Sequence, residues 1–156
     1  MSNALSAANL AKFVVIASAS RGSETSAGNM QRTAKAHMQL SHLGRSVKNL
    51  EMVTGFYREQ GMAEGSYEQS FAFGVNTAKT LDQVVKLFCD EFEQECVLVW
   101  NRDSDSVWLY STDGMTQLGH RGMRKVWSSL AAAEFNNATL SDAYTIAADG
   151  SVWEVR

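Results

Sequence analysis

The feature that most constrains this chain is a β-hairpin flanked on both sides by a helix and a strand. Two segments alternate apolar and polar side chains with the period of a strand, and a loose glycine-bearing turn separates them. The expected elements are a strand at 13–19, a helix at 29–43, strands at 50–58 and 66–75, a helix from Thr80, and a strand at 96–100. The order β-α-β-β-α-β predicts an α+β, ferredoxin-like sandwich, with both helices on one face of an antiparallel sheet.

Both helices are predicted from apolar side chains at helical spacing. The second helix begins at a capping box formed by Thr80 and Gln83. Its expected buried stripe consists of Leu81, Val84, Val85, Phe88 and Phe92. The expected stripe of the first helix consists of Met30, Ala34, Met38 and Leu43, and Gly44 is placed to end that helix.

The C-terminal third carries weaker signals. A fifth strand is expected at 107–111, and the ambiguous segment 114–137 is predicted to be helical around 120–133. Asp149-Gly150 predicts a type I′ hairpin between the last two strands. The 156 residues are expected to form one domain, 1–156, with 1–11 as a flexible lead-in.

The alternation of the 66–75 strand separates a face for the helices from a face of small side chains. The small-residue face consists of Ser66, Ser70, Ala72 and Gly74. If the helices cover only the other face, this one is bare, and small residues let another backbone approach closely. We therefore expect a subunit interface here, with Tyr57 and Glu68 on the same face.

Composition excludes several classes of function. The formal net charge is −3, so no basic surface is available for nucleic acid or an anionic membrane. No segment approaches the roughly 20 apolar residues of a membrane span. Cys89 and Cys96 fit neither a redox pair nor a zinc site, and free thiols of this kind suit a reducing cytosol. The three histidines form no ligand set, so no metal is expected.

Glu68 and Tyr57 carry the strongest chemical hint. A carboxylate on a strand face is most often only solvated, and an aromatic side chain there most often packs at an interface. If a partner closes the face, the carboxylate loses water and needs a cation or hydrogen-bond donors. An aromatic ring beside it also attracts cations. Both interpretations remain open on these residues alone.

Several short segments occur in an order that resembles a known family. They are "SASR" at the end of the first strand, "NMQRTAKAHM", "TGFYRE", Glu68 eleven residues beyond Tyr57, "EFEQECVLVW", and the terminal "GSVWEVR". Together they resemble the phage-encoded enzymes that degrade S-adenosylmethionine (SAM), called SAM hydrolases and, on a revised mechanism, SAM lyases. The resemblance covers residues 13–111 and the terminal hairpin, but not 112–140.

The resemblance implies a homotrimer of sandwiches similar to the PII (GlnB-like) signalling proteins, with active sites between subunits. It implies cleavage of SAM to methylthioadenosine and a homoserine-derived product, without a cofactor, in the cytoplasm of an infected cell. Tyr57 and Glu68 fall where the family has its catalytic tyrosine and glutamate. Ser18, Ser20 and Arg21, at the end of the first strand, are the candidates for binding the nucleotide or carboxylate end of SAM.

The residues leave the mechanism open. No His–carboxylate pair or metal motif is present to activate water, which favours a lyase reaction over a hydrolase that gives homoserine directly. A non-catalytic trimer that senses adenine nucleotides on the same scaffold is the alternative from a different class, although no basic cluster for phosphates is evident.

Overall fold

A computed structural model describes residues 4–5, 11–58 and 61–156. Most of the predicted lead-in, 1–11, lies outside the described residues. The N-terminal elements are β1 (Phe13–Ala17), α1 (Ser26–His42), the 3₁₀ turn η1 (Gly44–Ser46), β2 (Lys48–Tyr57), β3 (Ser66–Val75), α2 (Ala78–Lys86) and the π-helix η2 (Leu87–Glu91). The C-terminal elements are β4 (Val97–Asn101), β5 (Ser106–Ser111), β6 (Gly114–Gly119), β7 (Met123–Trp127), α3 (Leu130–Phe135), β8 (Ala143–Ile146) and β9 (Val152–Val155).

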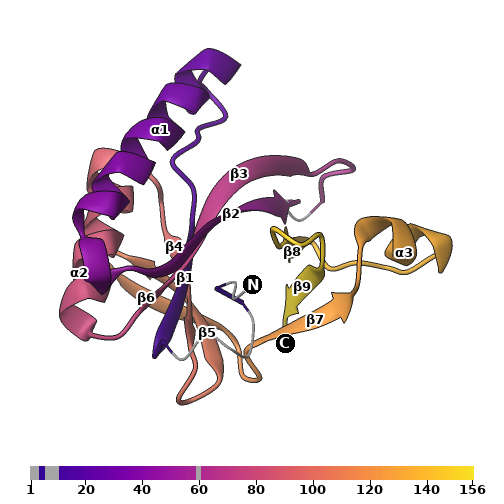
Figure 1. Cartoon of the computed structure of the whole chain (residues 1–156). Helices are drawn as coiled ribbons and strands as arrows, with labels where there is room; N and C mark the ends of the chain where they lie inside the picture. The colour runs from indigo at the N-terminus through magenta and orange to yellow at the C-terminus, as the bar shows by residue number, and fades with distance from the viewer. Residues whose placement is uncertain (1–3, 6–10, 59–60) are drawn as a thin grey trace.

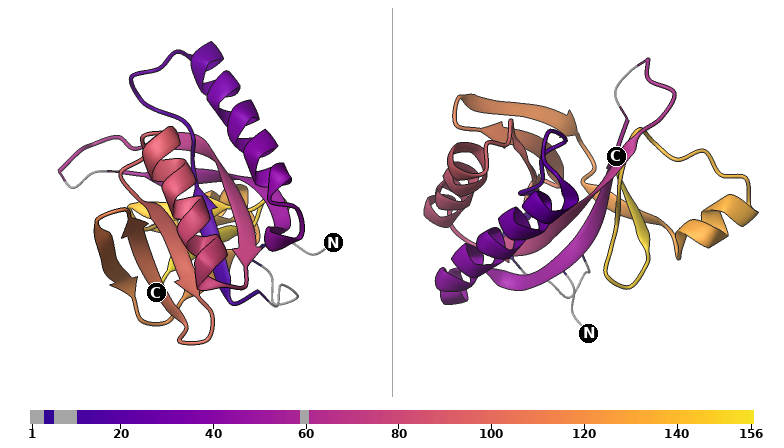
Figure 2. Two further views of the ribbon diagram at one scale, coloured as in Figure 1. Left: turned by 90° about the vertical axis from the view of Figure 1, so that its left-hand side faces the viewer. Right: turned by 90° about the horizontal axis from the view of Figure 1, so that it is seen from above.

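The described strands form one antiparallel sheet of nine strands in the order β6-β5-β4-β1-β3-β2-β8-β9-β7. In its centre lie β4-β1-β3-β2, where α1 connects β1 to β2 and α2 precedes β4. Both helices lie on the same side of this central part, while β7, β8, β9 and α3 extend away from them (Figures 1 and 2). The predicted α+β class with an antiparallel sheet is confirmed.

The sheet is strongly curled, and its connectivity requires this. The two outermost strands, β6 and β7, are joined by residues 120–122 alone. Nine flat strands about 4.8 Å apart would place the outer strands roughly 38 Å apart. Three linking residues span at most about 14 Å. The sheet therefore bends until its edges approach each other, and the end of β6 meets the end of β9 so closely that a Cβ on Gly119 would collide with Arg156 O and the Val155 side chain.

The helix-covered face holds the larger hydrophobic core. The predicted stripe of the second helix is confirmed, because Leu81, Val84 and Val85 of α2, Phe88 of η2 and Phe92 directly after η2 are all buried in this core. The predicted cap is wrong: Thr77 caps α2, and its hydroxyl accepts a hydrogen bond from Thr80 N–H at 3.1 Å. Thr80 itself lies inside the helix and is buried.

Helix α1 forms where it was expected but buries a different face. Ala36 and Leu40 are its buried residues, whereas Met30 is 72% exposed and Met38 is 56% exposed. The predicted stripe of α1 is therefore wrong. Methionine packs adaptably, and its hydrophobicity alone does not tell which side of a helix meets the sheet.

The small-residue face of β3 is not bare within the single chain. Ala72 is fully buried and Ser70 is 4% exposed. The curl of the sheet lays a second core over this face, formed by Ala4, Leu5, Val14, Ile16, Val53, Ala72, Trp100, Val107, Met123 and Ala147. The predicted interface through Ser70, Ala72 and Gly74 is therefore wrong, because the chain itself occupies the space that was assigned to a partner. Ser66, at the start of β3, remains exposed.

The C-terminal third departs most from expectation. The helix predicted around 120–133 is wrong for most of its length, because β7 occupies 123–127 and only α3 is helical. The hairpin at Asp149-Gly150 is confirmed, but the type I′ turn is wrong. Gly150 has φ 89°, while Asp149 is not among the described residues with positive φ, and a three-residue loop joins the paired Ala147 and Ser151. In the described part of the chain, no helix is long and apolar enough to cross a membrane.

Candidate active site

Two adjoining cavities open inside and beside the curl of the sheet. The inner cavity has a volume of about 360 Å³ and the outer one about 700 Å³. The inner wall is largely apolar and includes Leu98, Leu109, Leu118, Met123 and Trp153. The outer wall is polar and includes Ser20, Arg21, Ser23, Glu93 and Glu95. The residues that line both cavities, and so mark the junction between them, are Tyr57, Glu68, Gln94, Cys96 and Leu109.

The β2–β3 hairpin brings Tyr57 and Glu68 to this junction. In its register Gly55 pairs with Glu68 and Tyr57 pairs with Ser66, so both side chains lie on the concave face. Gly55 leaves space beside the Ser70 hydroxyl, because a Cβ at residue 55 would lie only 3.3 Å from it. The two residues predicted to be catalytic are therefore neighbours at one position of the cavity wall.

The Glu68 side chain is exposed in the single chain, but the cavity wall removes part of the water around its carboxyl group. Desolvation raises its pKa above the ordinary value of a glutamate, and a hydrogen bond from Ser18 partly offsets this rise. The Ser18 hydroxyl also lies 3.0 Å from Gln69 O, and its one hydrogen can be donated to only one acceptor at a time. No cationic side chain contributes to the pKa shift of Glu68. A bound cation would therefore give the Glu68 carboxylate an ion-pair partner.

The other predicted binding residues follow β1 around the same cavities. Ser18 lines the inner cavity, while Ser20 and Arg21 line the outer one. Ser18 is 6% exposed, and its hydroxyl accepts a hydrogen bond from Ser20 N–H at 3.0 Å. The structure therefore brings all five predicted residues around one pair of cavities.

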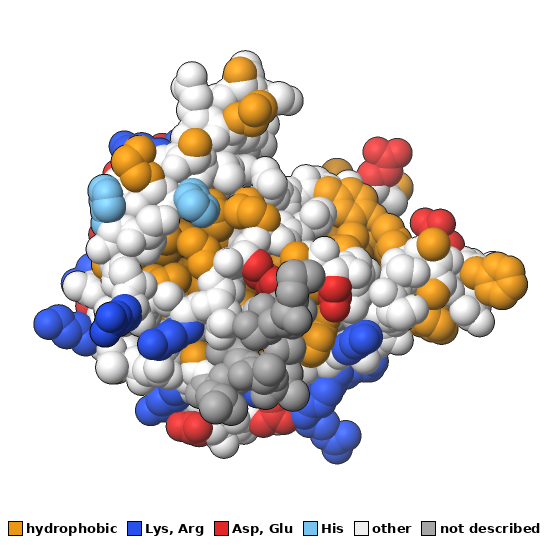
Figure 3. Space-filling view, viewed as in Figure 1, with side chains coloured by type: hydrophobic (Ala, Val, Ile, Leu, Met, Phe, Trp, Pro, Cys, Tyr) orange, Lys and Arg blue, Asp and Glu red, His pale blue; other side chains and the backbone are white. Residues whose placement is uncertain are grey.

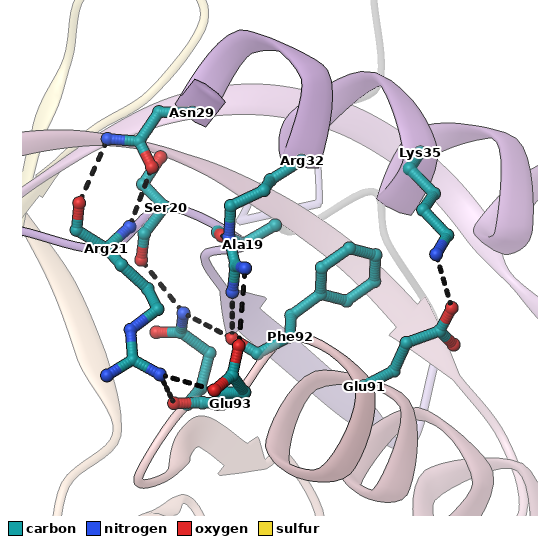
Figure 4. Close-up of polar contacts among 10 residues, drawn as sticks. Ala19, Ser20, Arg21, Asn29, Arg32, Lys35, Glu91, Phe92 and Glu93 are labelled. Carbon is teal, nitrogen blue, oxygen red and sulfur yellow. Dashed lines mark hydrogen bonds and ion pairs between the residues drawn. The ribbon is translucent and has the colours of Figure 1, made fainter. Parts of the chain in front are cut away.

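Arg21 is already paired within the chain. Its guanidinium contacts the Glu93 carboxylate at 3.0 Å, and its N–H and C=O both bond to the Asn29 side-chain amide, at 2.8 and 3.1 Å (Figure 4). This pairing neutralises much of the positive charge that Arg21 offers to a ligand.

Arg32 holds two walls of the outer cavity together. From α1 its guanidinium donates to Ala19 O at 2.7 Å and to Phe92 O, and it lies 3.5 Å from the Glu93 carboxylate (Figure 4). It also lies over the Phe92 ring. These contacts join the segment after β1 to the end of η2, directly beside Ser20 and Glu93 of the outer cavity.

The charge balance of the site favours a cationic ligand. Among the described residues, those that line the outer cavity include the carboxyl groups of Glu68, Glu93 and Glu95 and one cationic side chain, Arg21. Glu93 is paired with both Arg21 and Arg32, so Glu68 and Glu95 are the carboxyl groups left without an ion pair among the described residues. Residues 4–5, 11–58 and 61–156 contain no cluster of three or more His, Cys, Asp or Glu side chains that could hold a metal ion.

Comparison with known proteins assigns the family. The sequence model of the S-adenosylmethionine lyase family matches residues 15–156. The chain belongs to this family. A search of curated proteins gave no match. The protein is therefore a lyase that acts on SAM, and the family match includes residues 112–140, for which the sequence segments showed no resemblance.

In this SAM lyase, sequence reasoning missed the apolar wall of the site. Leu118 and Met123 come from β6 and β7, in the ambiguous segment 114–137 that was predicted to be helical around 120–133. Trp153 comes from β9, which was predicted as a strand but was given no place in the site. Gln94 and Cys96 were missed because "EFEQECVLVW" served only as a segment of the family resemblance, with no role in the site given to its residues, and Cys96 was considered only as a free thiol. One local signal was present. The polar pair Gln94 and Glu95 lies just before the apolar run 96–100, and a cavity wall begins at this change from polar to apolar side chains.

Proposed function

We propose that this chain cleaves SAM into 5′-methylthioadenosine and L-homoserine lactone, by attack of the substrate's own carboxylate on its Cγ. The observation that carries the proposal is the position of Glu68 and Tyr57 at the junction of an apolar and a polar cavity. In SAM, the sulfonium joins the adenosine to the amino-acid chain. A SAM molecule with its adenosine in the inner cavity and its amino-acid part in the outer one has this cation beside Glu68 and Tyr57.

The chemistry is balanced without a cofactor or a proton transfer. A carboxylate oxygen forms a bond to Cγ and closes a five-membered ring, while the Cγ–S bond breaks and its electron pair stays on sulfur. The sulfonium becomes a neutral thioether, so the leaving group needs no acid. Holding the two reacting groups of one molecule together contributes about 7–11 kcal/mol to such reactions.

The environment of Glu68 supports this route. Carboxylate and sulfonium neutralise each other as the reaction proceeds, and a poorly hydrated site favours such a transition state over the charge-separated substrate. Desolvation is the main cause that raises the pKa of Glu68, although the residue is still exposed in the single chain, and a bound SAM would exclude further water from the junction. Direct hydrolysis to homoserine would need a base that activates water. The described residues that line the two cavities include no histidine, so a carboxylate such as Glu68 would have to act as this base instead of facing the cation.

The proposal includes a homotrimer of ferredoxin-like, PII-like sandwiches. The order β4-β1-β3-β2 with its two helix crossovers supports the ferredoxin-like assignment of the central sheet. Large apolar side chains left on the surface support self-assembly. Hydrophobic side chains are visible on the surface over α1 and α3 (Figure 3). Phe135 on α3 is 87% exposed and Met30 on α1 is 72% exposed. Because the small-residue face is filled from within, these outer surfaces replace it as the proposed contact.

The proposed setting is the cytoplasm of a phage-infected cell, where loss of SAM starves restriction-modification enzymes. The resemblance of residues 13–111 to phage enzymes supports it. A sensor of adenine nucleotides is the weaker alternative, because phosphate groups would meet the carboxylates of Glu68, Glu93 and Glu95 in the outer cavity.

The test is to incubate the purified protein with SAM and to follow products by mass spectrometry. The proposal expects methylthioadenosine and homoserine lactone in equal amounts at early times. Binding of ATP without any SAM cleavage would replace it with the sensor function.

A further inference from the structure

Gln94 lies at the junction of the two cavities but has no assigned role. It belongs to the five residues that line both cavities, together with Tyr57 and Glu68. Its backbone is fixed by the way η2 ends: Glu93 takes a left-handed conformation with φ 57°, and Gln94 N–H bonds to Phe88 O at 3.0 Å. The chain therefore presents the Gln94 side chain to the cavities at a defined position.

The side-chain amide of Gln94 is also fixed, and its orientation is unambiguous. Nε2 lies 2.8 Å from Ser20 O and 3.2 Å from Phe92 O. Both partners are carbonyl oxygens, which only accept, so the NH₂ end must face them. The Oε1 atom is then held as an acceptor, and no hydrogen bond engages it among the residues that the structure describes.

We propose that Gln94 Oε1 accepts a hydrogen bond from the α-ammonium group of SAM and thereby selects substrates that carry this group. The proposal rests on the proposed function, which places the amino-acid part of SAM in the outer cavity. The neighbouring carboxylate of Glu95 lines that cavity, has no ion pair among the described residues and favours a cation there.

Binding SAM through its ammonium group suits the reaction. A cation that gripped the substrate carboxylate would stabilise its negative charge and weaken it as a nucleophile. Arg21, the cation of the outer cavity, is held by Glu93 instead. Gln94 can therefore anchor the amino-acid chain while the carboxylate remains free to turn toward Cγ.

The test compares two substrates in Gln94→Met and Gln94→Glu. The substrates are SAM and a sulfonium analogue that lacks the α-amino group but keeps the carboxylate. The readout is the ratio of kcat/KM for SAM to kcat/KM for the analogue, because loosening of the Ser20 and Phe92 contacts slows both substrates alike and cancels in the ratio. Gln39→Met, on the surface of α1 outside both cavities, is the matched control.

We expect Gln94→Met to lower this ratio about tenfold, as for the loss of one hydrogen bond to a charged donor. Gln94→Glu keeps an acceptor oxygen, so the ratio stays at or above the wild-type value even if total activity falls. Gln39→Met leaves the ratio unchanged. An unchanged ratio in active Gln94→Met overturns the proposal and leaves Gln94 as a tether of the loop only. Failure of the wild type to cleave SAM at all would refute the proposed function instead.

Discussion

Replacing Glu68 with glutamine tests what the carboxylate at the cavity junction does. The substitution removes the charge and preserves the shape. Two unit charges about 4 Å apart attract by about 1 kcal/mol in water and about 4 kcal/mol at an effective dielectric constant near 20. Glu68 is partly desolvated but still reaches solvent in the single chain, so a value between these limits applies. A loss of about 3 kcal/mol lowers kcat/KM about a hundredfold.

Most of this loss should appear in KM. The ammonium of SAM keeps its charge through the reaction, and the sulfonium loses its charge, so neither cation is bound more tightly by Glu68 in the transition state than in the ground state. We expect kcat of Glu68→Gln to stay within a few-fold of the wild type. Steady-state assays that quantify methylthioadenosine over a wide range of SAM concentrations measure both constants.

Glu64→Gln is the matched control, because it removes an equal charge from the β2–β3 connection without touching either cavity. It should behave as the wild type. A folded Glu68→Gln variant with unchanged kcat/KM would refute any contact of Glu68 with substrate. A hundredfold loss of kcat at unchanged KM would show that Glu68 acts in the chemical step, as a base that activates water would.

The remaining predictions concern stability. Because desolvation raises the folded-state pKa of Glu68, the folded chain holds this proton more tightly than the unfolded chain, and the free energy of unfolding falls as pH rises through the folded pKa. Glu68→Gln should therefore be more stable than the wild type at neutral pH, with a difference that vanishes below the unfolded pKa of about 4.3; an equal or lower stability at pH 7 in urea titrations would contradict this. Ala72→Trp should lower the free energy of unfolding by about 1–3 kcal/mol or more, at every protein concentration, because Ala72 lies in the interior of one chain. If Ala72→Trp lowered the free energy of unfolding only at low protein concentration, Ala72 would lie in a subunit interface and not in the interior of one chain. Arg32→Ala should cost on the order of 2–3 kcal/mol in denaturant titrations by removing charged donors from two backbone carbonyls. Arg32→Lys should not restore this stability, because a single ammonium group cannot donate to both carbonyls as the forked guanidinium does. Wild-type stability in Arg32→Lys would refute the role of the two guanidinium hydrogen bonds.

Local patterns predicted the central sheet because the information there is local. The stripe from Leu81 to Phe92 has only one apolar side, so its buried face follows from spacing alone. The alternation of β2 and β3 placed Tyr57 and Glu68 on one face, and the hairpin register keeps them there. The sequence alone was therefore sufficient to predict Tyr57 and Glu68 as neighbours in the candidate site.

The parts of the fold that were predicted wrongly depend on the curling of the sheet, which brings distant segments of the chain together. Local sequence patterns do not encode these contacts. Met30 and Met38 are apolar enough for a core, but the residues of α1 that are buried are Ala36 and Leu40. Met123 belongs to a strand because β9 and the curl of the sheet provide a pairing partner, although its neighbours alone read as helix. The same closure fills the face around Ala72 and creates the apolar wall of the inner cavity.

The central claim, that the carboxylate of SAM is the nucleophile, is tested most directly by the position of ¹⁸O in homoserine after reaction in ¹⁸O-labelled water. A lactone formed on the enzyme contains no label, and its later hydrolysis in solution at the acyl carbon places ¹⁸O in the carboxyl group. The account predicts unlabelled lactone at early times and homoserine labelled only in its carboxyl group. Homoserine with ¹⁸O in the γ-hydroxyl group would mean that water attacked Cγ, and it would contradict the lyase mechanism.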